Sequence, residues 1–482
     1  MSIKNKIGIV ITAIVLISNI GCKVSQPAPL PHIQTPTVYA DSLGVDSTSL
    51  GDVPWKQLFT DPYLVSLIDT ALQQNLDLKR AMQRITIARN QYYISKGALL
   101  PRVDAEVTAG VDKYGKYTQS GVGNYDTNLS DNLNSKQRIP YPVTPDFFAG
   151  LRSTWELDIW GKLKNLKKAA YARFLASQKG EQLIRTSLVA EVASRYYQLL
   201  ALDNELAIIQ NNIRLQDSAL EIVKIQKQAA RANELAVEQF RAQLLHTMAL
   251  KGITLQQITE TENEINMLLG RYPQPVLRDT SLLSKTLPSI VQAGVPAQLL
   301  HRRPDIQQAE LELVAAKADV SAARAAFYPN VTLTPYVGMN AFKLPMMVNA
   351  GSLTYGILGG LTAPVFHQGM LRRNLSTASA ARIDAYYAYQ QTIQNGVREV
   401  VNSLSSIQNL EEVYRLKEKE AEVLNQAVIT SNLLFKTGYA SYLEVITAQR
   451  SVIDAQMQLV HTKEQMFYSL IELYRALGGG WK

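Results

Sequence analysis

The sequence predicts an α+β membrane protein made of two internal repeats, in which short strands precede very long helices. Three observations support this class. The two halves of the chain match each other, two regions lack helix breakers for about 65 residues, and four segments alternate apolar and polar residues. With 46% hydrophobic residues among 482, the chain is also too apolar to be disordered.

The N-terminus is typical of an export signal. Two lysines precede an apolar stretch over 7–20, which is too short to cross a bilayer comfortably. Cys22, the only Cys of the chain, follows it in a context that resembles a bacterial lipobox. We therefore predict a signal peptide over 1–21, lipidation of Cys22, and a Pro-rich extended tether over 22–54. A buried free Cys within a plain membrane anchor is the alternative.

The remainder of the chain is predicted to be a duplicated domain. A shift of 208 positions places Gly161 on Gly369 and Val237 on Val445. Upstream the shift grows, so the first half holds about 20 extra residues between Pro101 and Gly161. The predicted parts are a first repeat, a linker and a second repeat, over 55–270, 271–302 and 303–482.

Each half is expected to contain a long helix followed by a return helix. Residues 163–229 contain no Pro and a single Gly, and their apolar residues follow three-four spacing. The return helices are predicted over about 233–269 and 441–477, after short turns at 230–232 and 437–440. Helices of this length need partner helices along their length. The helices alone do not exclude a dimeric cytoskeletal coiled coil, which is the alternative.

Before each long helix, two segments alternate with the period of a strand. They begin near Val103, Phe147, Val331 and Leu353, and each has one apolar and one polar face. About ten residues per segment suits a tilted strand that crosses a bilayer. Four strands cannot close a barrel in lipid, so copies of the chain would have to pool them: a dimer would give eight and a trimer twelve. A soluble α+β protein with two hairpins packed on helices is the alternative.

Several functional classes are disfavoured. The net charge of +8 is modest, and no Lys/Arg run is dense enough for a nucleic-acid partner. The five His residues show no metal-ligand spacing, and a single Cys excludes a Cys-based zinc site. Neither a phosphate-binding loop nor an arrangement of catalytic residues stands out. We therefore expect no enzyme activity and no cofactor.

Several stretches together carry a resemblance to a known family. They are 53–59 (VPWKQLF), 98–101 (ALLP), 155–161 (WELDIWG), 296–306 (PAQLLHRRPDI) and 322–329 (AARAAFYP). The chain resembles the outer membrane efflux channels of the TolC superfamily, and within it the lipidated NodT-type factors of tripartite, RND-type export systems. The resemblance covers nearly all of the chain that follows Cys22.

This resemblance implies a homotrimer in the outer membrane. Three protomers, with four strands each, would form a twelve-stranded β-barrel, continued by a long α-helical barrel in the periplasm. Residues 60–75, residues 271–302 and the chain termini would lie in a belt around the tunnel, and residues 112–146 in an enlarged extracellular loop. The chain would be held by its lipid and its barrel. It would conduct drugs, small molecules or metal ions passively from a periplasmic adaptor and an inner membrane transporter, which implies a role in antibiotic resistance.

The resemblance also assigns roles to residues at the periplasmic end. Arg231 and Asn233 in the first turn, with Gly438 and Ser441 in the second, would form tips that contact the adaptor. The gate of the family carries two acidic positions after the second tip. Glu444 matches the first, whereas Thr447 stands at the second, so only a single acidic ring is implied. A solvated helix residue is the alternative for Glu444.

Three alternatives remain on sequence. A type I protein-secretion exit channel would share the same fold, although the NodT-like stretches favour small solutes. A non-conducting coiled-coil lipoprotein that bridges envelope layers would share the helices. The segment His301-Arg302-Arg303 suggests either an anion site or the start of a helix at Pro304.

Overall fold

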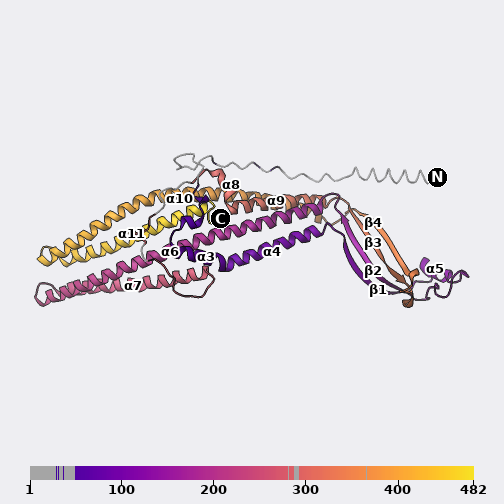
Figure 1. Cartoon of the computed structure of the whole chain (residues 1–482), viewed down its shortest axis with the longest axis horizontal. Helices are drawn as coiled ribbons and strands as arrows, with labels where there is room; N and C mark the ends of the chain where they lie inside the picture. The colour runs from indigo at the N-terminus through magenta and orange to yellow at the C-terminus, as the bar shows by residue number, and fades with distance from the viewer. Residues whose placement is uncertain are drawn as a thin grey trace. The chain divides into compact units, whose positions relative to one another are not determined.

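The computed structural model describes residues 29, 31, 36, 49–279, 282–286, 293–364 and 366–481 (Figure 1). The described residues form two compact units. We call Arg89–Arg173 with Leu313–Ala385 the strand unit. The helix unit consists of the described residues from 36 to Ala88, those of Phe174–Glu312 and those from Tyr386 onwards. The predicted signal peptide, Cys22 and most of the tether lie outside the described residues.

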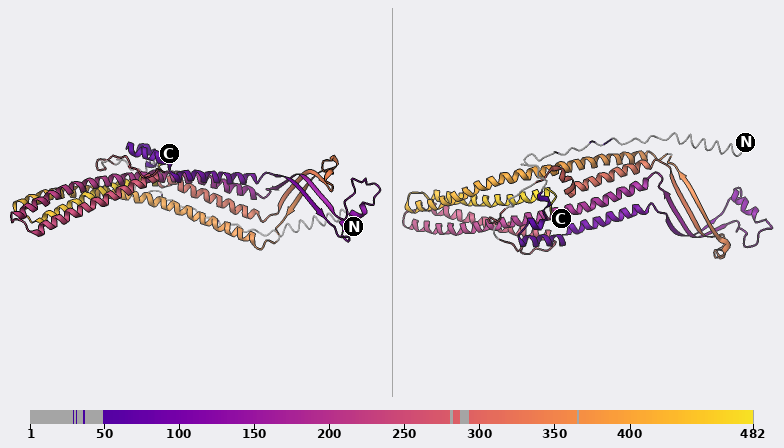
Figure 2. Two further views of the ribbon diagram at one scale, coloured as in Figure 1. Left: turned by 90° about the horizontal axis from the view of Figure 1, so that it is seen from below. Right: turned by 45° about the horizontal axis from the view of Figure 1, so that its top comes forward.

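The strand unit contains one antiparallel sheet, and it confirms the four predicted strands. Its order is β1 (Arg102–Asp112), β2 (Thr144–Leu157), β3 (Asn330–Ala341) and β4 (Leu353–Thr362). Each strand pairs with the next along the chain, which leaves β1 and β4 as edge strands within one protomer (Figure 2). β2 begins earlier and β3 ends later than the alternation of side chains alone indicates.

The helices of the two halves correspond in length. The pairs are α4 (Leu76–Gly97, 22 residues) with α9 (Pro304–Ala325, 22), α6 (Lys162–Gln228, 67) with α10 (Met370–Thr437, 68), and α7 (Glu234–Leu268, 35) with α11 (Tyr442–Ala476, 35). The predicted long and return helices are therefore present. The sequence prediction omits α4, although Leu78, Ala81, Ile85, Ala88 and Tyr92, its buried and half-buried apolar residues, follow three-four spacing.

The two long helices begin in the same way. Gly161 and Gly369 precede them with φ of 76° and 75°, a conformation that glycine adopts without strain. At α6, the carboxylate of Asp158 accepts hydrogen bonds from the backbone N–H groups of Leu163 (2.9 Å) and Lys164 (2.8 Å). These bonds satisfy donors that the first turn of a helix leaves free. The equal geometry at positions 208 apart supports the internal repeat.

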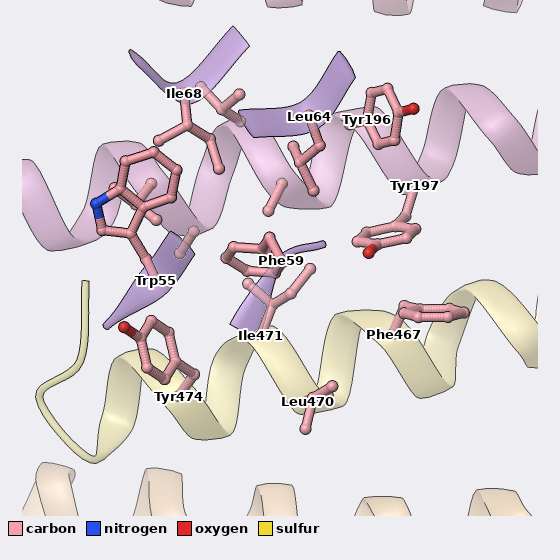
Figure 3. Packing of buried hydrophobic residues seen from close by; sticks show 14 of the residues in the cluster. Trp55, Phe59, Leu64, Ile68, Tyr196, Tyr197, Phe467, Leu470, Ile471 and Tyr474 are labelled. Carbon is pink, nitrogen blue, oxygen red and sulfur yellow. The ribbon is translucent and has the colours of Figure 1, made fainter. Parts of the chain in front are cut away.

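The main core lies in the helix unit, where the segment after the tether packs between α6 and α11 (Figure 3). Tyr197 stacks on Phe467 with ring centroids 4.3 Å apart, and Phe59 meets Tyr474 edge to face. The hydroxyl of Tyr474 donates to the carbonyl of Val53 at 2.7 Å. These large rings bury much apolar area, which fixes the N-terminal segment against both long hairpins.

The helix unit also contains short elements in the regions predicted to form a belt. They are η1 (Leu50–Asp52), α2 (Trp55–Leu58), α3 (Pro62–Gln74), η2 (Pro296–Gln298) and α8 (Leu299–Arg302). α3 starts with Asp61 as its N-cap and Pro62 in its first turn, a favoured combination.

The segment between β1 and β2 is more ordered than a plain loop. It contains the helix α5 (Gln119–Thr127), capped by the Thr118 side chain. The Asn128 amide spans the rest of the segment, donating to the Ile139 carbonyl at 2.7 Å and accepting from the Ile139 N–H at 2.8 Å. Because side-chain amides and not apolar periodicity order this segment, the sequence pattern predicts only a loop. Two 3₁₀ turns, η3 (Leu344–Met346) and η4 (Ala350–Ser352), connect β3 to β4.

Candidate functional site

One face of the sheet is apolar from edge to edge. The cross-strand register places Val107 opposite Ala149, Ala149 opposite Met339, and Met339 opposite Leu353, so the apolar positions of all four strands share a face. Much of this face is exposed in the single chain. Exposed fractions reach 83% for Val107 and 77% for both Tyr355 and Ile357. A continuous apolar surface of this kind is typical of contact with lipid.

Aromatic residues lie at the end of the sheet from which β1 and β3 start. The Trp160 ring stacks on Tyr328, with centroids 4.9 Å apart, and its Nε1 donates to the Pro329 carbonyl at 2.8 Å. The Nε1 of Trp155 donates to the Leu99 carbonyl at 3.0 Å. Tryptophan with an apolar ring and a satisfied N–H is favoured at the boundary between hydrocarbon and water. Trp155, Trp160 and Tyr328 therefore gather at one end of the sheet.

The opposite face of the sheet carries the polar and small residues. It includes threonines such as Thr108 and Thr332, and glycines such as Gly150 and Gly338. A sheet with one apolar and one hydrated face is what a barrel wall between lipid and water requires. Among the described residues, no helix combines the length and the apolarity needed to cross a bilayer.

The two turns at the far ends of the long helices have the same backbone. Ala230 has φ of 60° and Gly438 has φ of 83°, both left-handed. After them, Arg231 N–H donates to the Gln226 carbonyl (2.8 Å) and Tyr439 N–H donates to the Leu434 carbonyl (2.9 Å). This is the Schellman arrangement that ends a helix. Arg231 and Gly438 are exposed, as their predicted place at the tips requires.

The return helices start at the other two predicted tip residues. Asn233 is the N-cap of α7, and its side chain accepts a hydrogen bond from the Ala236 N–H at 2.9 Å. Ser441 is the N-cap of α11. Both caps lie beside a small core that joins the two hairpins, in which Val445 is fully buried against residues of α6 and α7 such as Phe240.

The two residues predicted to gate the channel lie in the first turns of α11. Glu444 is exposed, and its carboxylate accepts a hydrogen bond from the backbone N–H of Ser441. This contact is half of a capping box, which the spacing Ser-x-x-Glu already indicates in the sequence. Thr447 is exposed too, and its hydroxyl donates to the Leu443 carbonyl at 2.8 Å. Glu444 thus has a structural role within one protomer, whatever it does in an assembly.

The basic segment before α9 is structural. The Arg303 side chain is 5% exposed, and its guanidinium donates to Asp305, to Glu399 (2.8 Å) and to the Ala476 carbonyl (3.0 Å). Because these protein groups already occupy the guanidinium, Arg303 offers no site for a free anion, and the start of a helix at Pro304 is the correct alternative. Burial alone would lower the pKa of Arg303, but its two carboxylates outweigh burial and raise it.

A second buried cluster is absent from the sequence prediction. Asp61 accepts from the Tyr196 hydroxyl and the Lys285 ammonium, each at 2.7 Å, and from the Tyr63 N–H. Burial raises the pKa of Asp61, but its bonds to Lys285 and Tyr196 outweigh burial and lower it. The partners are far apart in sequence, so no local motif indicates them. Their contact ties α3 and the segment around Lys285 to α6.

Within the described part of the chain, no group of three or more His, Cys, Asp or Glu side chains is arranged to hold a metal ion.

Comparison with known proteins identifies relatives along almost the whole chain. The family described as outer membrane efflux protein matches residues 67–271 and 295–479. The cation efflux system protein CusC of Escherichia coli O6:H1 is 29% identical over 469 residues, which cover 96% of each chain. The solvent efflux pump outer membrane protein SrpC of Pseudomonas putida is 28% identical over 467 residues, 96% of each. SilC of Salmonella typhimurium, a probable outer membrane lipoprotein, is 28% identical over 455 residues, 94% of each.

Solved structures share the fold. A crystal structure of CusC, described for its folding and transmembrane channel formation, matches with a TM-score of 0.81 at 27% identity, over 95% of this chain and 100% of that one. The open state of the MtrE outer membrane channel of Neisseria gonorrhoeae matches with a TM-score of 0.81 at 25% identity, over 96% and 99%. Because the family matches most of the chain, the protein belongs to the outer membrane efflux protein family and is an efflux channel of the outer membrane.

Proposed function

We propose that three copies of the chain form one conducting channel, with twelve strands in a single barrel. The observation that carries this proposal is the four-stranded sheet with an apolar face and two edge strands, β1 and β4. In lipid, unpaired backbone groups at these edges would cost several kcal/mol each, so copies must pair edge to edge. Two copies would give a barrel of eight strands, and side chains fill the interior of a barrel of that size. Three copies leave a water-filled lumen.

Purified protein reconstituted into planar bilayers tests this proposal. We expect discrete single-channel currents, and a mass by light scattering that corresponds to three chains after correction for detergent. A non-conducting coiled-coil lipoprotein would give neither current nor membrane-inserted strands. A particle of two chains, or a trimer without conductance, would contradict the proposal.

We propose that Cys22 carries the lipid anchor. The lipobox-like context supports this, as does the similarity to SilC, which is described as a probable outer membrane lipoprotein. Labelled palmitate should be incorporated into the wild-type chain and lost in the Cys22→Ser variant. Incorporation that persists in this variant would exclude Cys22.

We propose that the exposed turns formed by Arg231, Asn233, Gly438 and Ser441 receive a periplasmic adaptor, which joins the channel to an inner membrane transporter. The relatives CusC and SrpC are named for a cation efflux system and a solvent efflux pump, which supports such an assembly. A photo-crosslinking residue at Arg231 should capture a periplasmic protein in cells. The same residue at the exposed position Lys116, in the segment between β1 and β2, should not.

We propose that Glu444 forms a ring of three carboxylates at a narrow periplasmic opening, with Thr447 beside it. Glu444→Gln tests the charge alone, because glutamine at the third helical position keeps the capping box. We expect weaker cation selectivity in this variant, and an unchanged melting temperature. If Glu444→Ala alters selectivity but Glu444→Gln does not, the role of Glu444 is only to cap α11.

We propose that the cargo consists of small solutes, since relatives are named for efflux of cations and solvents. The chain itself would supply neither catalysis nor a bound cofactor. Deletion should sensitise cells to such compounds and leave protein secretion unchanged. The opposite result would favour a type I secretion exit channel. A pump whose own deletion gives the same phenotype would identify the exported compound.

A further inference from the structure

The polar face of the sheet carries one interstrand ion pair near its centre. Nε of Arg152, on β2, lies 2.9 Å from Oε2 of Glu106, on β1. Both side chains remain accessible, with exposed fractions of 53% for Arg152 and 34% for Glu106. In the register, Glu106 is opposite Gly150, two residues before Arg152, so the pair is diagonal. Such contacts are within reach of long side chains on the same face.

An aromatic ring lies beneath the guanidinium of this pair. The Cζ atom of Arg152 lies over the Phe148 ring, 5.8 Å from its centroid. Phe148 is only 7% exposed, although it belongs to the polar face, and Tyr336 meets it edge to face at 6.4 Å. The ring therefore supports the charged group from below, and a cation–π contact adds to the ion pair.

Two glycines make the seat of this ring. A Cβ atom built on Gly150 would lie 2.9 Å from Phe148, and one on Gly338 would also lie 2.9 Å from it. Neither position has room for a side chain, because the neighbouring backbone is still closer. Gly150 and Gly338 are cross-strand partners, so the seat spans β2 and β3. The layers in order are the glycine floor, the Phe148 ring and the Arg152 guanidinium.

The charges on this part of the face cancel in pairs. Besides Glu106 with Arg152, the Arg102 guanidinium pairs with Asp104 at 2.9 Å. Asp104 is opposite Arg152 in the register, yet Arg102 occupies it, which leaves Glu106 as the partner of Arg152. A wall whose ionised groups are paired presents little net field to a passing ion.

We propose that Glu106 and Arg152, supported by Phe148, form a charge-balanced band inside the barrel, which lets solutes of either charge pass this level. The inference rests on the proposed function, because the polar face becomes a lumen only when the copies close. Glu106 and Arg152 would be specificity-determining residues, and Phe148 a positioning residue. Three copies repeat the pair around the axis, so neutralising one partner creates three unpaired charges of one sign.

Reciprocal neutralisation tests this inference. Arg152→Gln leaves three carboxylates and should shift the reversal potential in a KCl gradient towards cation selectivity. Glu106→Gln leaves three guanidinium groups and should shift it towards anions. One unpaired charge at about 10 Å from an ion in water changes its local concentration by about twofold, so a change in permeability ratio of at least about twofold is expected. The double variant should return to the wild-type value.

Two controls accompany these variants. Thr108→Ala alters an exposed, uncharged residue of the same strand and face, and should leave the reversal potential unchanged. Arg152→Lys keeps the charge, so its reversal potential should stay within the wild-type range. If Arg152→Gln fails to fold, Glu106→Gln remains the neutral variant and Arg152→Lys its charge-conserving control. If wild-type protein does not conduct, the proposed channel fails and this inference with it. If wild-type protein conducts but the two neutral variants shift together, or neither shifts, the inference alone is overturned.

Discussion

The matched turns at the two helix tips allow one prediction to be worked out from backbone geometry. Gly438→Ala places a Cβ atom on a residue with φ of 83°. That Cβ would meet nothing within 4 Å, so no clash contributes and the whole effect is conformational. A left-handed conformation costs a non-glycine residue about 1 kcal/mol or more, and this cost destabilises the turn. At 1.4 kcal/mol per factor of ten, the turn should open about fivefold more often.

The first turn supplies the reverse experiment in the same molecule. Ala230 already carries this strain with φ of 60°, so Ala230→Gly should stabilise its turn. The gain should be of similar size, about 1 kcal/mol, because the strain and the freedom of the open state both enter with the opposite sign. The two substitutions thus act in opposite directions at positions related by the internal repeat.

Hydrogen exchange measured by mass spectrometry on detergent-purified protein reads both turns. The reporting amides are Tyr439, which donates to Leu434, and Arg231, which donates to Gln226. Peptides that contain Tyr439 should exchange about fivefold faster in Gly438→Ala, and those that contain Arg231 more slowly in Ala230→Gly. Peptides of the sheet are the internal control. Equal exchange at Tyr439 in the wild type and Gly438→Ala would refute the assignment of strain to φ.

The other predictions concern buried charges in the helix unit. Arg303→Met leaves Asp305 and Glu399 without their shared cation and should cost about 3–5 kcal/mol, seen as a lower melting temperature, whereas Arg80→Met at an exposed pair should change it little. Folding lowers the pKa of Asp61, so this carboxylate stabilises the folded state above its unfolded pKa of about 4, and the stabilisation is lost as pH falls through the folded pKa. Asp61→Asn should therefore remove this acid dependence from melting curves. An unchanged curve would exclude Asp61 as its source. Burial and, to a smaller extent, the charge of Glu464 raise the pKa of Glu205 to about 6, while His461 opposes this shift. The folded state therefore binds a proton at Glu205 more tightly than the unfolded state, and stability falls as pH rises from about 4.5 through 6. Glu205→Gln should abolish that fall, and a parallel decline in both proteins would contradict the assignment.

Features governed by local periodicity could be predicted from the sequence. The four strands follow from alternation, and the long and return helices follow from the absence of Pro and from the 208-residue repeat. The tips also follow, because Gly438 and the caps Asn233 and Ser441 are local signals. The Ser-x-x-Glu spacing at 441–444 could have indicated the capping role of Glu444 as well.

Features that depend on distant contacts could not be predicted. Asp61 meets Tyr196 across 135 positions and Lys285 across 224, and no pattern in the chain encodes either contact. The seat of Phe148 needs Gly338 from the other repeat, so its burial on a polar face appears only once β2 and β3 are in register. The helix α5 was missed because polar side-chain bonds hold its surroundings.

The unpaired outer edges of β1 and β4 give the proposed channel a genetic consequence. A subunit whose edge strand cannot pair would prevent closure of every trimeric barrel that it joins, because closure needs all three subunits. When a damaged and an intact allele are expressed equally and mix at random, only about one ring in eight would be wholly intact. Alleles such as Val107→Pro, in the middle of β1, would therefore act as dominant negatives if the chain still folds far enough to assemble.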